Sequence, residues 1–291
     1  MTSDTDAFAA IREVREACVT HDGHDPLDEA ADLALRHHGL DGALLELADG
    51  PDRAEDGGFA LVRDGELLLA VSPAARGRGL GADLATRVAA AGVPVDRAWS
   101  HGGHPAAEVL AERHGFEATR GLWVMRRPVD ADHPLPPLAA PDGVRLRGYD
   151  AADPADAAAV LRVNAAAFAH HPEQGDLDEA GLAERVAEPW FDADGLVMAV
   201  EEADGTLLAF HWTKRHDARL GEVYVVAVSP EAQGRGLGKV VTLAGLHHLA
   251  DGGVEEILLY VESDNAPAVA VYSGLGFAHA AKDTHVQYTR R

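Results

Sequence analysis

The strongest constraint on the fold is an eleven-residue segment that occurs twice in the chain. Val71 to Gly81 and Val228 to Gly238 are identical at nine of eleven positions, and the copies start 157 residues apart. Each copy is followed by a helical pattern, a strand, a second short helix and a Gly-Phe pair. A repeat of this length is too long for a solenoid and indicates a duplicated domain.

The bulk composition suits two soluble domains. The chain has 291 residues, about two domains' worth. A formal charge of −23 argues against nucleic acid or an anionic membrane as a partner. Cys18 is the only cysteine, which fits a reducing compartment. No apolar run reaches the roughly 18 residues of a membrane span, and we expect no signal peptide. We therefore expect a cytoplasmic monomer.

Both copies of the repeat predict a strand, a glycine turn and a helix. In the second copy the β-branched run Val223 to Val228 precedes the loop Gly234 to Gly238, and a helical pattern continues to Leu249. The backbone N–H groups of a helix N-terminus lack helical partners, and glycines allow a phosphate to approach them closely. The sequence therefore predicts an anion site at each loop.

The spacing of the loop selects among nucleotide-like ligands. The phosphate loop of nucleoside triphosphatases, Gly-x4-Gly-Lys-Ser/Thr, is excluded because Gly238-Lys239 is followed by Val240. The dinucleotide-binding pattern Gly-x-Gly-x-x-Gly is excluded because the glycines lie at positions 234, 236 and 238. Gln233-Gly-Arg-Gly-Leu-Gly238 instead resembles the acyl-CoA pyrophosphate loop of the GNAT superfamily of N-acetyltransferases. That resemblance implies an α/β (α+β) fold with a mixed sheet in two tandem GNAT acyl-CoA N-acyltransferase domains.

The order of predicted elements gives the domain boundaries. We expect an N-terminal GNAT-like domain over residues 1–127 and a C-terminal GNAT domain over residues 144–291. A segment with five prolines, residues 128–143, is expected to be an extended linker between them. The final predicted strand, residues 277–288, is assigned to the second domain.

The two copies differ where chemistry is expected. Aligning the Gly-Phe pairs puts Ala111 opposite Tyr272, and aligning the loops puts Gly65 opposite Glu222. Glu66 is one position off and is expected to face the other side of its strand. Glu222 is expected to share a strand face with Tyr224, Val226 and Val228. Only the second domain is therefore expected to be catalytic.

Acyl transfer from a thioester to an amine needs such groups. A carboxylate removes a proton from the incoming ammonium, and a phenol near the sulfur can protonate the departing thiolate. Direct attack within a ternary complex requires no serine or cysteine nucleophile. In GNAT enzymes a tyrosine on the helix after the parallel strand commonly protonates the thiolate, and Tyr272 matches that place.

A narrower resemblance covers nearly the whole chain. Phe210-His-Trp-Thr-Lys214, Gly221 to Val228, Leu243 to Leu249 and Leu259 to Asn265 are similar to mycothiol synthases. That family acetylates the cysteinyl amine of cysteinyl-glucosaminyl-inositol (desacetylmycothiol), the last step of mycothiol biosynthesis, with acetyl-CoA as co-substrate. Its N-terminal domain can hold acetyl-CoA without being an active transferase.

The resemblance implies roles for residues by matching motif. Glu222 and Tyr272 become the catalytic base and acid. Contacts to the pseudodisaccharide are implied for Glu29, Glu173, Lys214, Glu222 and Tyr260. The acetyl-CoA contacts of the second domain are Val226, Ala227, Val228, Gln233, Gly234, Arg235, Gly236, Leu237, Gly238, Lys239, Asn265, Ala266, Pro267, Ala268, Val269 and Ala270. Those of the first domain are Leu69, Ala70, Val71, Arg76, Gly77, Arg78, Gly79, Leu80 and Gly81.

Two other functions remain open at this point. One is a tandem N-acetyltransferase for another small amine, such as an aminoglycoside or a polyamine. The other is a non-catalytic acyl-CoA sensor, which would need neither Glu222 nor Tyr272. His101 with His104, and His247 with His248, lack nearby ligands at structural zinc spacing, so no metal is expected.

Overall fold

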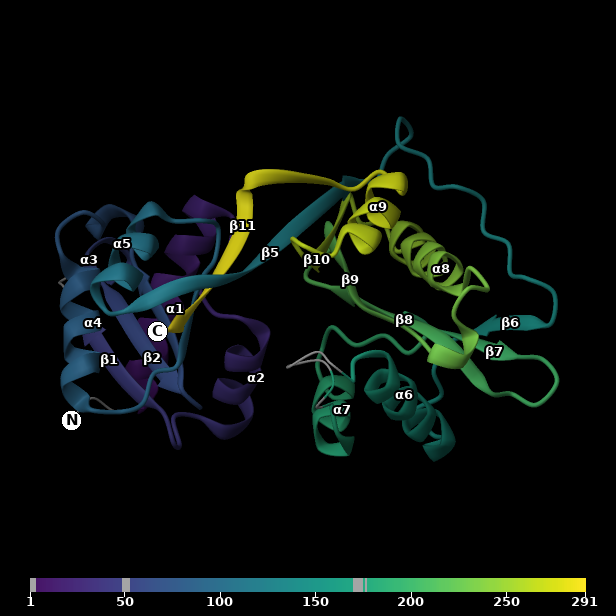
Figure 1. The fold of residues 1–291 in the computed structure, drawn as a ribbon, viewed down its shortest axis with the longest axis horizontal. Coiled ribbons are helices and arrows are strands. Elements are labelled where there is room, and N and C mark those ends of the chain that lie inside the picture. The colour runs from purple at the N-terminus through teal and green to yellow at the C-terminus, as the bar shows by residue number, and fades with distance from the viewer. Residues whose placement is uncertain (1–3, 49–52, 170–174, 176) are drawn as a thin grey trace. The chain divides into compact units, whose positions relative to one another are not determined.

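The chain folds as two units whose boundaries cut across the sequence repeats. The structure is a computed structural model that describes residues 4–48, 53–169, 175 and 177–291. Unit 1 comprises Met1–Trp123, Glu262–Asp264 and Ala280–Arg291, and unit 2 comprises Val124–Val261 and Asn265–His279. Figure 1 shows the ribbon and its element labels.

Unit 1 is a mixed sheet covered by helices, in the strand order β1-β2-β3-β4-β11-β5. The helices and strands predicted for the first repeat are present, but the predicted strand 93–99 begins only at Arg97, and the short helices α3 and η1 were not indicated by sequence periodicity. Its elements are α1 (Asp4–Asp22), α2 (Glu29–His38), β1 (Leu44–Ala48), α3 (Arg53–Asp56), β2 (Gly58–Arg63), β3 (Glu66–Val71), η1 (Pro73–Ala75), α4 (Leu80–Ala91), β4 (Arg97–Ser100), α5 (Pro105–Arg113), most of β5 (Phe116–Pro128) and most of β11 (Ala278–Arg290).

Unit 2 repeats this plan in the strand order β5-β10-β9-β8-β7-β6. Asp153 caps its first helix and Pro154 occupies the first turn, as the sequence predicted. The elements of unit 2 are β6 (Val144–Arg147), α6 (Pro154–Ala167), α7 (Glu179–Val186), β7 (Leu196–Glu201), β8 (Leu207–Arg215), β9 (Leu220–Val228), η3 (Pro230–Ala232), α8 (Leu237–Asp251), β10 (Glu256–Glu262) and α9 (Ala266–Gly274).

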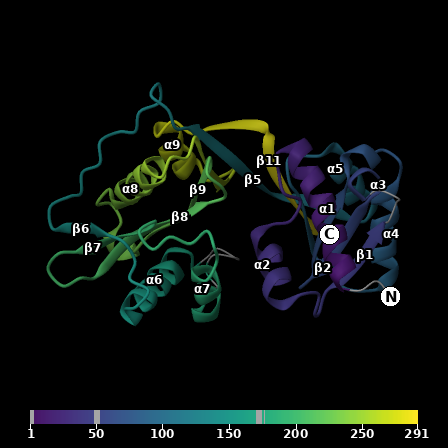
Figure 2. The ribbon, with the colours of Figure 1, turned by 180° about the vertical axis from the view of Figure 1, so that it is seen from behind.

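In each unit, helices bury apolar side chains on both faces of the sheet. In unit 1, α1 and α2 cover the face that carries Leu68 and Ala70, and α4 covers the face that carries Leu67 and Leu69. Figure 2 shows α1 and α2 on unit 1. In unit 2, α6 and α7 cover one face, where Trp212 is fully buried, and α8 covers the other. The alternation of burial along β3 follows from the two-residue period of a strand.

Three strands contribute to both units, which the sequence did not predict, although β10 contributes only its last residue, Glu262, to unit 1. β5 starts in unit 1, and its last residues from Val124 onward lie in unit 2. β11 starts in unit 2, and from Ala280 onward it belongs to unit 1, where Val286 to Thr289 pair antiparallel with β4. The observed units therefore differ from the expected ranges 1–127 and 144–291, because the last strand of the chain completes the sheet of unit 1.

The proline-rich segment lies within one unit. Residues 129–143 contain no helix or strand, as expected, but the segment starts and ends in unit 2 and does not join the units. His247 Nε2 of α8 lies 2.9 Å from the carbonyl oxygen of Pro136, and Arg127 donates to the carbonyl of His133 at 2.7 Å. These bonds hold the segment against unit 2.

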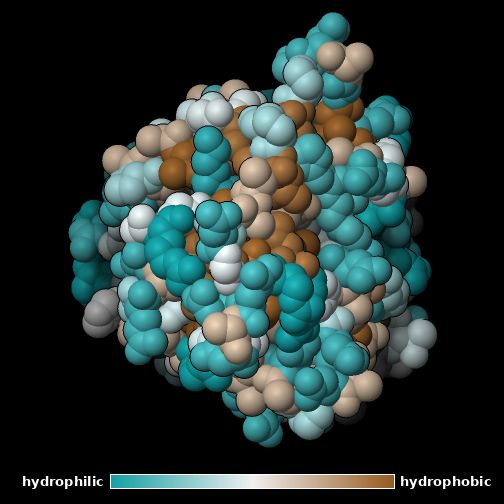
Figure 3. All heavy atoms as spheres, turned by 90° about the vertical axis from the view of Figure 1, so that its right-hand side faces the viewer, coloured by the Kyte–Doolittle hydropathy of each residue, from teal (hydrophilic) through white to brown (hydrophobic). Residues whose placement is uncertain are grey.

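The face of the molecule drawn in Figure 3 carries mostly hydrophilic side chains, with a band of apolar ones between them. No helix in the described ranges is both long and apolar enough to span a membrane.

Candidate active site

Both glycine loops fold as the sequence predicted, as strand, turn and helix N-terminus. Gly79 and Gly236 are the N-cap residues of α4 and α8, with φ of 92° and 74°. Those left-handed dihedrals favour glycine over residues that carry a Cβ. The first turn of each helix leaves backbone N–H groups without helical acceptors, so each loop presents donors to an anion.

Each unit has two neighbouring parallel strands, one before the glycine loop and one after the helix that follows it, and the two strands pair only at their beginnings. β10 pairs with β9 from Glu256↔Leu220 to Leu259↔Val223, and the pairing stops before Val226, Ala227 and Val228. In unit 1, β3 and β4 pair only at Glu66↔Arg97 and Leu67↔Ala98. Beyond these pairs the neighbouring backbone edges are free to hydrogen-bond an extended ligand that carries amides. In each unit the glycine loop follows the strand end at which the two parallel strands are no longer paired.

A β-bulge in β9 corrects one expectation. The register against β8 passes from Val225↔Trp212 to Val223↔Thr213, so Tyr224 is an extra residue. Val225 and Ala227 therefore face α6 and α7, whereas Val226 and Val228 pack against α8. The expectation that Glu222 shares a face with Val226 and Val228 is wrong, because it assumed unbroken alternation.

Glu222 lies at the point where β9 and β10 separate. It pairs across the sheet with Lys214, whose Nζ lies 4.9 Å from the ring centroid of Trp190 and 5.4 Å from that of Tyr224. Paired residues share a face, so Glu222 points to the α6 and α7 side. Its side chain is buried, and an oxygen lies 2.6 Å from Nε2 of His216.

His216 is the partner that sequence reasoning missed. It lies in the turn between β8 and β9, where its backbone N–H donates to the carbonyl of Leu220. Its side chain is about a third exposed, unlike that of Glu222. The hairpin turn thus joins a buried carboxylate to solvent through one imidazole. The sequence signal that could have indicated this partner is the position of His216, six residues before the candidate base Glu222.

Tyr272 lies on α9, half-buried, with its ring 6.0 Å from that of Phe277. Burial raises the pKa of its phenol, so the group is protonated at neutral pH. Asn265 is the N-cap of the same helix, and its side chain accepts from the backbone N–H of Ala268 at 3.2 Å. Ala266 to Ala270 form the first turns of α9 and carry no side-chain donors.

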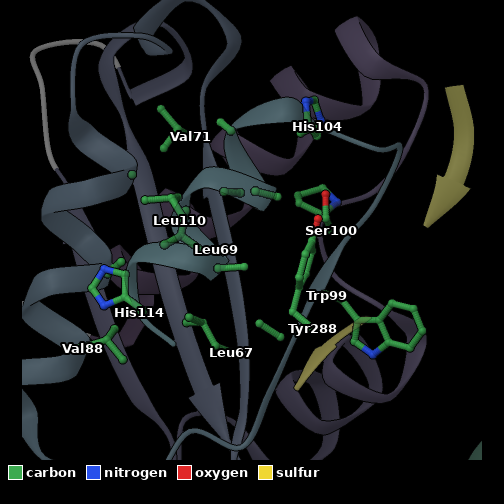
Figure 4. A pocket seen from close by; sticks show the side chains of 18 of the residues that line it. Leu67, Leu69, Val71, Val88, Trp99, Ser100, His104, Leu110, His114 and Tyr288 are labelled. Carbon is green, nitrogen blue, oxygen red and sulfur yellow. The ribbon is translucent and has the colours of Figure 1, made fainter. Parts of the chain in front are cut away.

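Unit 1 contains a cavity of about 400 Å³ at the corresponding place. Figure 4 shows Leu67, Leu69 and Val71 of β3 together with Leu110 of α5 and Trp99 of β4. Of the expected acetyl-CoA contacts of unit 1, Arg78 alone is absent from the lining, and its guanidinium lies 3.2 Å from Asp56. The Arg76 guanidinium donates to both carboxylate oxygens of Asp22, at 2.8 and 2.5 Å.

The remaining expected residues are dispersed. Lys239 is exposed in the first turn of α8, and Arg235 forms an ion pair with Glu201 at 2.9 Å. Tyr260 is 43% exposed on β10, beyond the paired segment. Glu29 is the first residue of α2, in unit 1. Glu173 lies outside the described residues.

Comparison with known proteins places these features in a family. The model of the acetyltransferase (GNAT) family matches residues 164–277. A mycothiol acetyltransferase of a Nocardioides species is 58% identical over 98% of this chain and 98% of its own length. The mycothiol acetyltransferase of Rhodococcus jostii is 45% identical, with 97% and 94% of the two chains covered. The chain belongs to the mycothiol acetyltransferase family.

Solved structures agree on the fold. A tandem GNAT protein from the clavulanic acid biosynthesis pathway has a TM-score of 0.70 at 19% identity, covering 99% of this chain and 96% of its own. A GCN5-related N-acetyltransferase from Sphaerobacter thermophilus has a TM-score of 0.65 at 21% identity, with 98% and 92% covered. This mycothiol acetyltransferase family member is thus an acyltransferase of tandem GNAT fold, as the sequence predicted.

Proposed function

We propose that the chain transfers the acetyl group of acetyl-CoA to the cysteinyl amine of cysteinyl-glucosaminyl-inositol, which gives mycothiol and CoA. The observation that carries the proposal is the buried carboxylate of Glu222, which lies where the pairing of the parallel strands β9 and β10 ends, in a chain of this family. We call this place the vertex of the two strands, which separate beyond it. A pure acyl-CoA sensor would have no use for a carboxylate at that place.

The residues of unit 2 suit an acyl-CoA. Gln233 to Lys239 offer backbone N–H groups at a helix N-terminus, which fits a diphosphate. Val226 to Val228 offer a strand edge that β10 leaves unpaired, which fits the amides of an extended pantetheine arm. Because the protein carries a formal charge of −23, these local donors must offset an unfavourable overall field. Bound acetyl-CoA supplies the thioester.

Glu222 is the proposed base. Its oxygen faces the same side as Lys214 and Tyr224, away from the α8 side on which the glycine loop starts its helix. An amine that approaches from that side can deliver its proton to the carboxylate as nitrogen attacks the thioester carbon. His216, which is hydrogen-bonded to Glu222 and partly exposed, can pass that proton to water.

Tyr272 is the proposed acid. Its phenol is protonated at neutral pH, because the ordinary pKa of tyrosine is about 10 and burial raises that of Tyr272 further. A protonated phenol can donate to the sulfur as the C–S bond breaks, which lowers the barrier to thiolate departure. The helix α9 that carries it follows the splayed strand β10 directly.

The substrate contacts follow from position and charge. Lys214 is held over two aromatic rings beside Glu222, where its ammonium can hydrogen-bond sugar or inositol hydroxyls. Tyr260 adds a partly exposed phenol on β10, directly after the last residue that pairs with β9. Glu173 and Glu29 are added to the proposal only from the resemblance of their motifs to those of mycothiol synthases. In unit 1, the loop Arg76 to Gly81 and the cavity beneath it are proposed to hold a second acetyl-CoA.

A competition among amines tests the proposal. The protein is incubated with acetyl-CoA and either cysteinyl-glucosaminyl-inositol, putrescine or an aminoglycoside, and the acetylated products are measured by mass spectrometry. We expect kcat/KM for the cysteinyl amine to exceed the others by at least about 10²-fold, the discrimination that a site built for specific polar groups can reach. Equal or better turnover of putrescine or the aminoglycoside would overturn the substrate assignment.

A further inference from the structure

The cavity of unit 1 reaches both faces of its sheet. Cys18 and His24 line it on the side of α1 and α2, and Val88 lines it on the side of α4. Beyond the pair Leu67↔Ala98 the strands β3 and β4 are unpaired, so the cavity passes between them. A ligand in this passage would lie between two strand ends.

Two buried polar atoms line this passage. They are Oγ of Ser100, a residue that is only 6% exposed, and Nε2 of His101. Within the described ranges, neither atom has a hydrogen-bond partner. Figure 4 shows Ser100 of β4 facing the same space as Leu69 of β3. Buried polar atoms without partners are rare because burial without a hydrogen bond is unfavourable, so these two indicate a ligand that supplies the partners.

A chain of hydrogen bonds behind His101 links it to a carboxylate. Oδ1 of Asp283 lies 3.1 Å from Nε2 of His24. Nδ1 of His24 lies 3.4 Å from Nε2 of His285, and Nδ1 of His285 lies 3.0 Å from Nδ1 of His101. The four side chains come from three parts of unit 1, which are the segment between α1 and α2, the end of β4, and β11.

The carboxylate end of the chain determines where the protons lie. An ionised carboxylate only accepts, so a neutral His24 donates to Asp283 from Nε2 and accepts at Nδ1. His285 then donates to His24 from Nε2 and accepts at Nδ1 the Nδ1–H of His101. Nε2 of His101 is therefore unprotonated, and it presents an acceptor to the cavity. Burial lowers the pKa of His101 to about 4, which keeps its ring neutral at neutral pH.

An acceptor and a hydroxyl on one cavity wall suit a ligand that carries secondary amides. An amide N–H can donate to Nε2 of His101, and the hydroxyl of Ser100 can donate to an amide oxygen. The pantetheine arm of CoA carries two secondary amides. An acetyl group has no N–H or O–H, so the arm and not the acyl group meets the requirement of His101.

We propose that Ser100 and His101 bind an amide-bearing segment of the pantetheine arm of CoA or an acyl-CoA in unit 1. The three side chains behind His101 are positioning residues, which keep its Nε2 an acceptor. No bond of the ligand is made or broken there. The inference rests on the acyl-CoA site proposed at Arg76 to Gly81.

The second repeat lacks this pair of groups. Alignment of the Gly-Phe pairs places Val261 opposite Ser100 and Glu262 opposite His101. Val261 has no polar side-chain atom, and the carboxylate of Glu262 accepts a hydrogen bond from Arg120. The proposed contacts are therefore particular to the ligand of unit 1, which allows the two sites to be tested separately.

The test first confines binding to unit 1 in the full-length protein. Gly238→Asp puts a carboxylate where the loop of unit 2 is proposed to hold a diphosphate, and a Cβ there meets only Val228, at 3.5 Å. Calorimetric titration of this variant with CoA should show one site. Gly81→Asp, the matched change in unit 1, should remove that site. No site in Gly238→Asp would contradict the proposed acyl-CoA site of unit 1, and this inference with it.

His101→Phe in the Gly238→Asp protein removes the acceptor and keeps a ring. We expect CoA to bind about 10-fold more weakly, because a buried amide N–H then lacks its partner. His101→Gln should recover part of the affinity, since its side-chain oxygen can accept. His38→Phe is the matched control, because His38 of α2 is exposed and does not line the cavity, and it should bind CoA as the parent does.

Analogues of CoA in which one or the other amide is an ester test for direct contact, since an ester has no N–H. One of them should bind the Gly238→Asp protein about 10-fold more weakly than CoA does. The same analogue should bind the His101→Phe variant as well as CoA does, because the interaction is already lost there. Equal losses in both proteins, or no loss with either ester, would overturn the inference while the site of unit 1 stands.

Nitrogen-15 NMR of the histidine side chains tests the positioning residues without substituting them. In the Gly238→Asp protein at pH 7.5, we expect His101 to be protonated at Nδ1 and bare at Nε2. Addition of CoA should shift the Nε2 resonance of His101 in the direction that hydrogen bonding produces. A proton on Nε2 before CoA is added, as an extra proton on His24 would cause by reversing the chain, overturns the assignment. An Nε2 resonance that bound CoA leaves unchanged also overturns it.

Discussion

At the scale of single residues, the chemistry of unit 2 depends on one buried carboxylate and one phenol on different elements. Glu222 is held by β9 beside Lys214 and His216, and Tyr272 is held by α9 against Phe277. The residue types and their motifs were visible in the sequence. His216 was not foreseen, because its role depends on the turn that brings it back to within 2.6 Å of Glu222.

Removal of the Tyr272 hydroxyl should separate binding from turnover. Tyr272→Phe keeps the ring against Phe277 and removes only the proton donor, so acetyl-CoA affinity should stay within twofold. We expect kcat to fall by about 10²-fold, the usual size of a general acid contribution. Steady-state kinetics and calorimetry measure the two quantities. The matched control is Tyr149→Phe, a buried tyrosine of the same unit outside the site, and unchanged kcat in Tyr272→Phe would reject the assigned role.

At the scale of elements, the strands and helices follow from local patterns, but their registers do not. Valine-rich alternation predicted β9, and the paired glycine loops predicted the N-termini of α4 and α8. The bulge at Tyr224 depends on which β8 residue pairs with which β9 residue, and no local pattern states this. That single insertion places Val226 and Val228 on the face opposite Glu222, and it is the reason why Glu66 of β3, rather than Gly65, has the strand register of Glu222.

The packing of α8 on β8 gives a second prediction. Gly245 of α8 lies against the buried ring of His211, and a Cβ at residue 245 would come 2.0 Å from its Nδ1. The ring is fully buried and its Nδ1 lies 3.1 Å from the carbonyl oxygen of Val241, so it has little room to move away from an added methyl group. Gly245→Ala should therefore destabilise the protein by about 1–3 kcal/mol through overpacking.

Urea unfolding at pH 7.5 measures this effect. Gly274→Ala at the end of α9 is the control, because a Cβ there meets no atom within 4 Å. The control should be neutral or stabilising by up to about 1 kcal/mol, since alanine favours helix over glycine. Equal stability of Gly245→Ala and the unsubstituted protein would show that the helix can shift away from His211.

At the scale of the whole molecule, the exchange of strand ends makes the repeats inseparable. Sequence duplication indicated two domains, and each unit has its own cores. The duplication could not indicate that residues 280–291 complete unit 1. The closing strands of the two repeats, β5 and β11, occupy the same place in the order of elements, so the sequence does not tell which of them enters which sheet. The pairing of β11 with β4 joins residues far apart in the sequence, and local sequence patterns do not predict it.

Several contacts anchor the last strand in unit 1. Asp283 lies 3.1 Å from Nε2 of His24, and His285 lies between His24 and His101, with nitrogen separations of 3.4 and 3.0 Å. Tyr288 is buried in the core beside α4. These side chains are buried or nearly so, so their loss would expose both the β4 edge and the core of unit 1.

A chain that ends at His279 tests the consequence. It should keep unit 2 folded, because that unit ends at His279, and it should unfold or loosen unit 1. Hydrogen exchange should show lost protection of the β4 amides from Arg97 to Ser100, with β8 protection retained, because local stability follows local packing. A synthetic peptide of residues 278–291 should restore β4 protection when added in excess, by pairing with the open edge. Protection of β4 at the full-length level in the shortened chain would mean that unit 1 closes without its last strand.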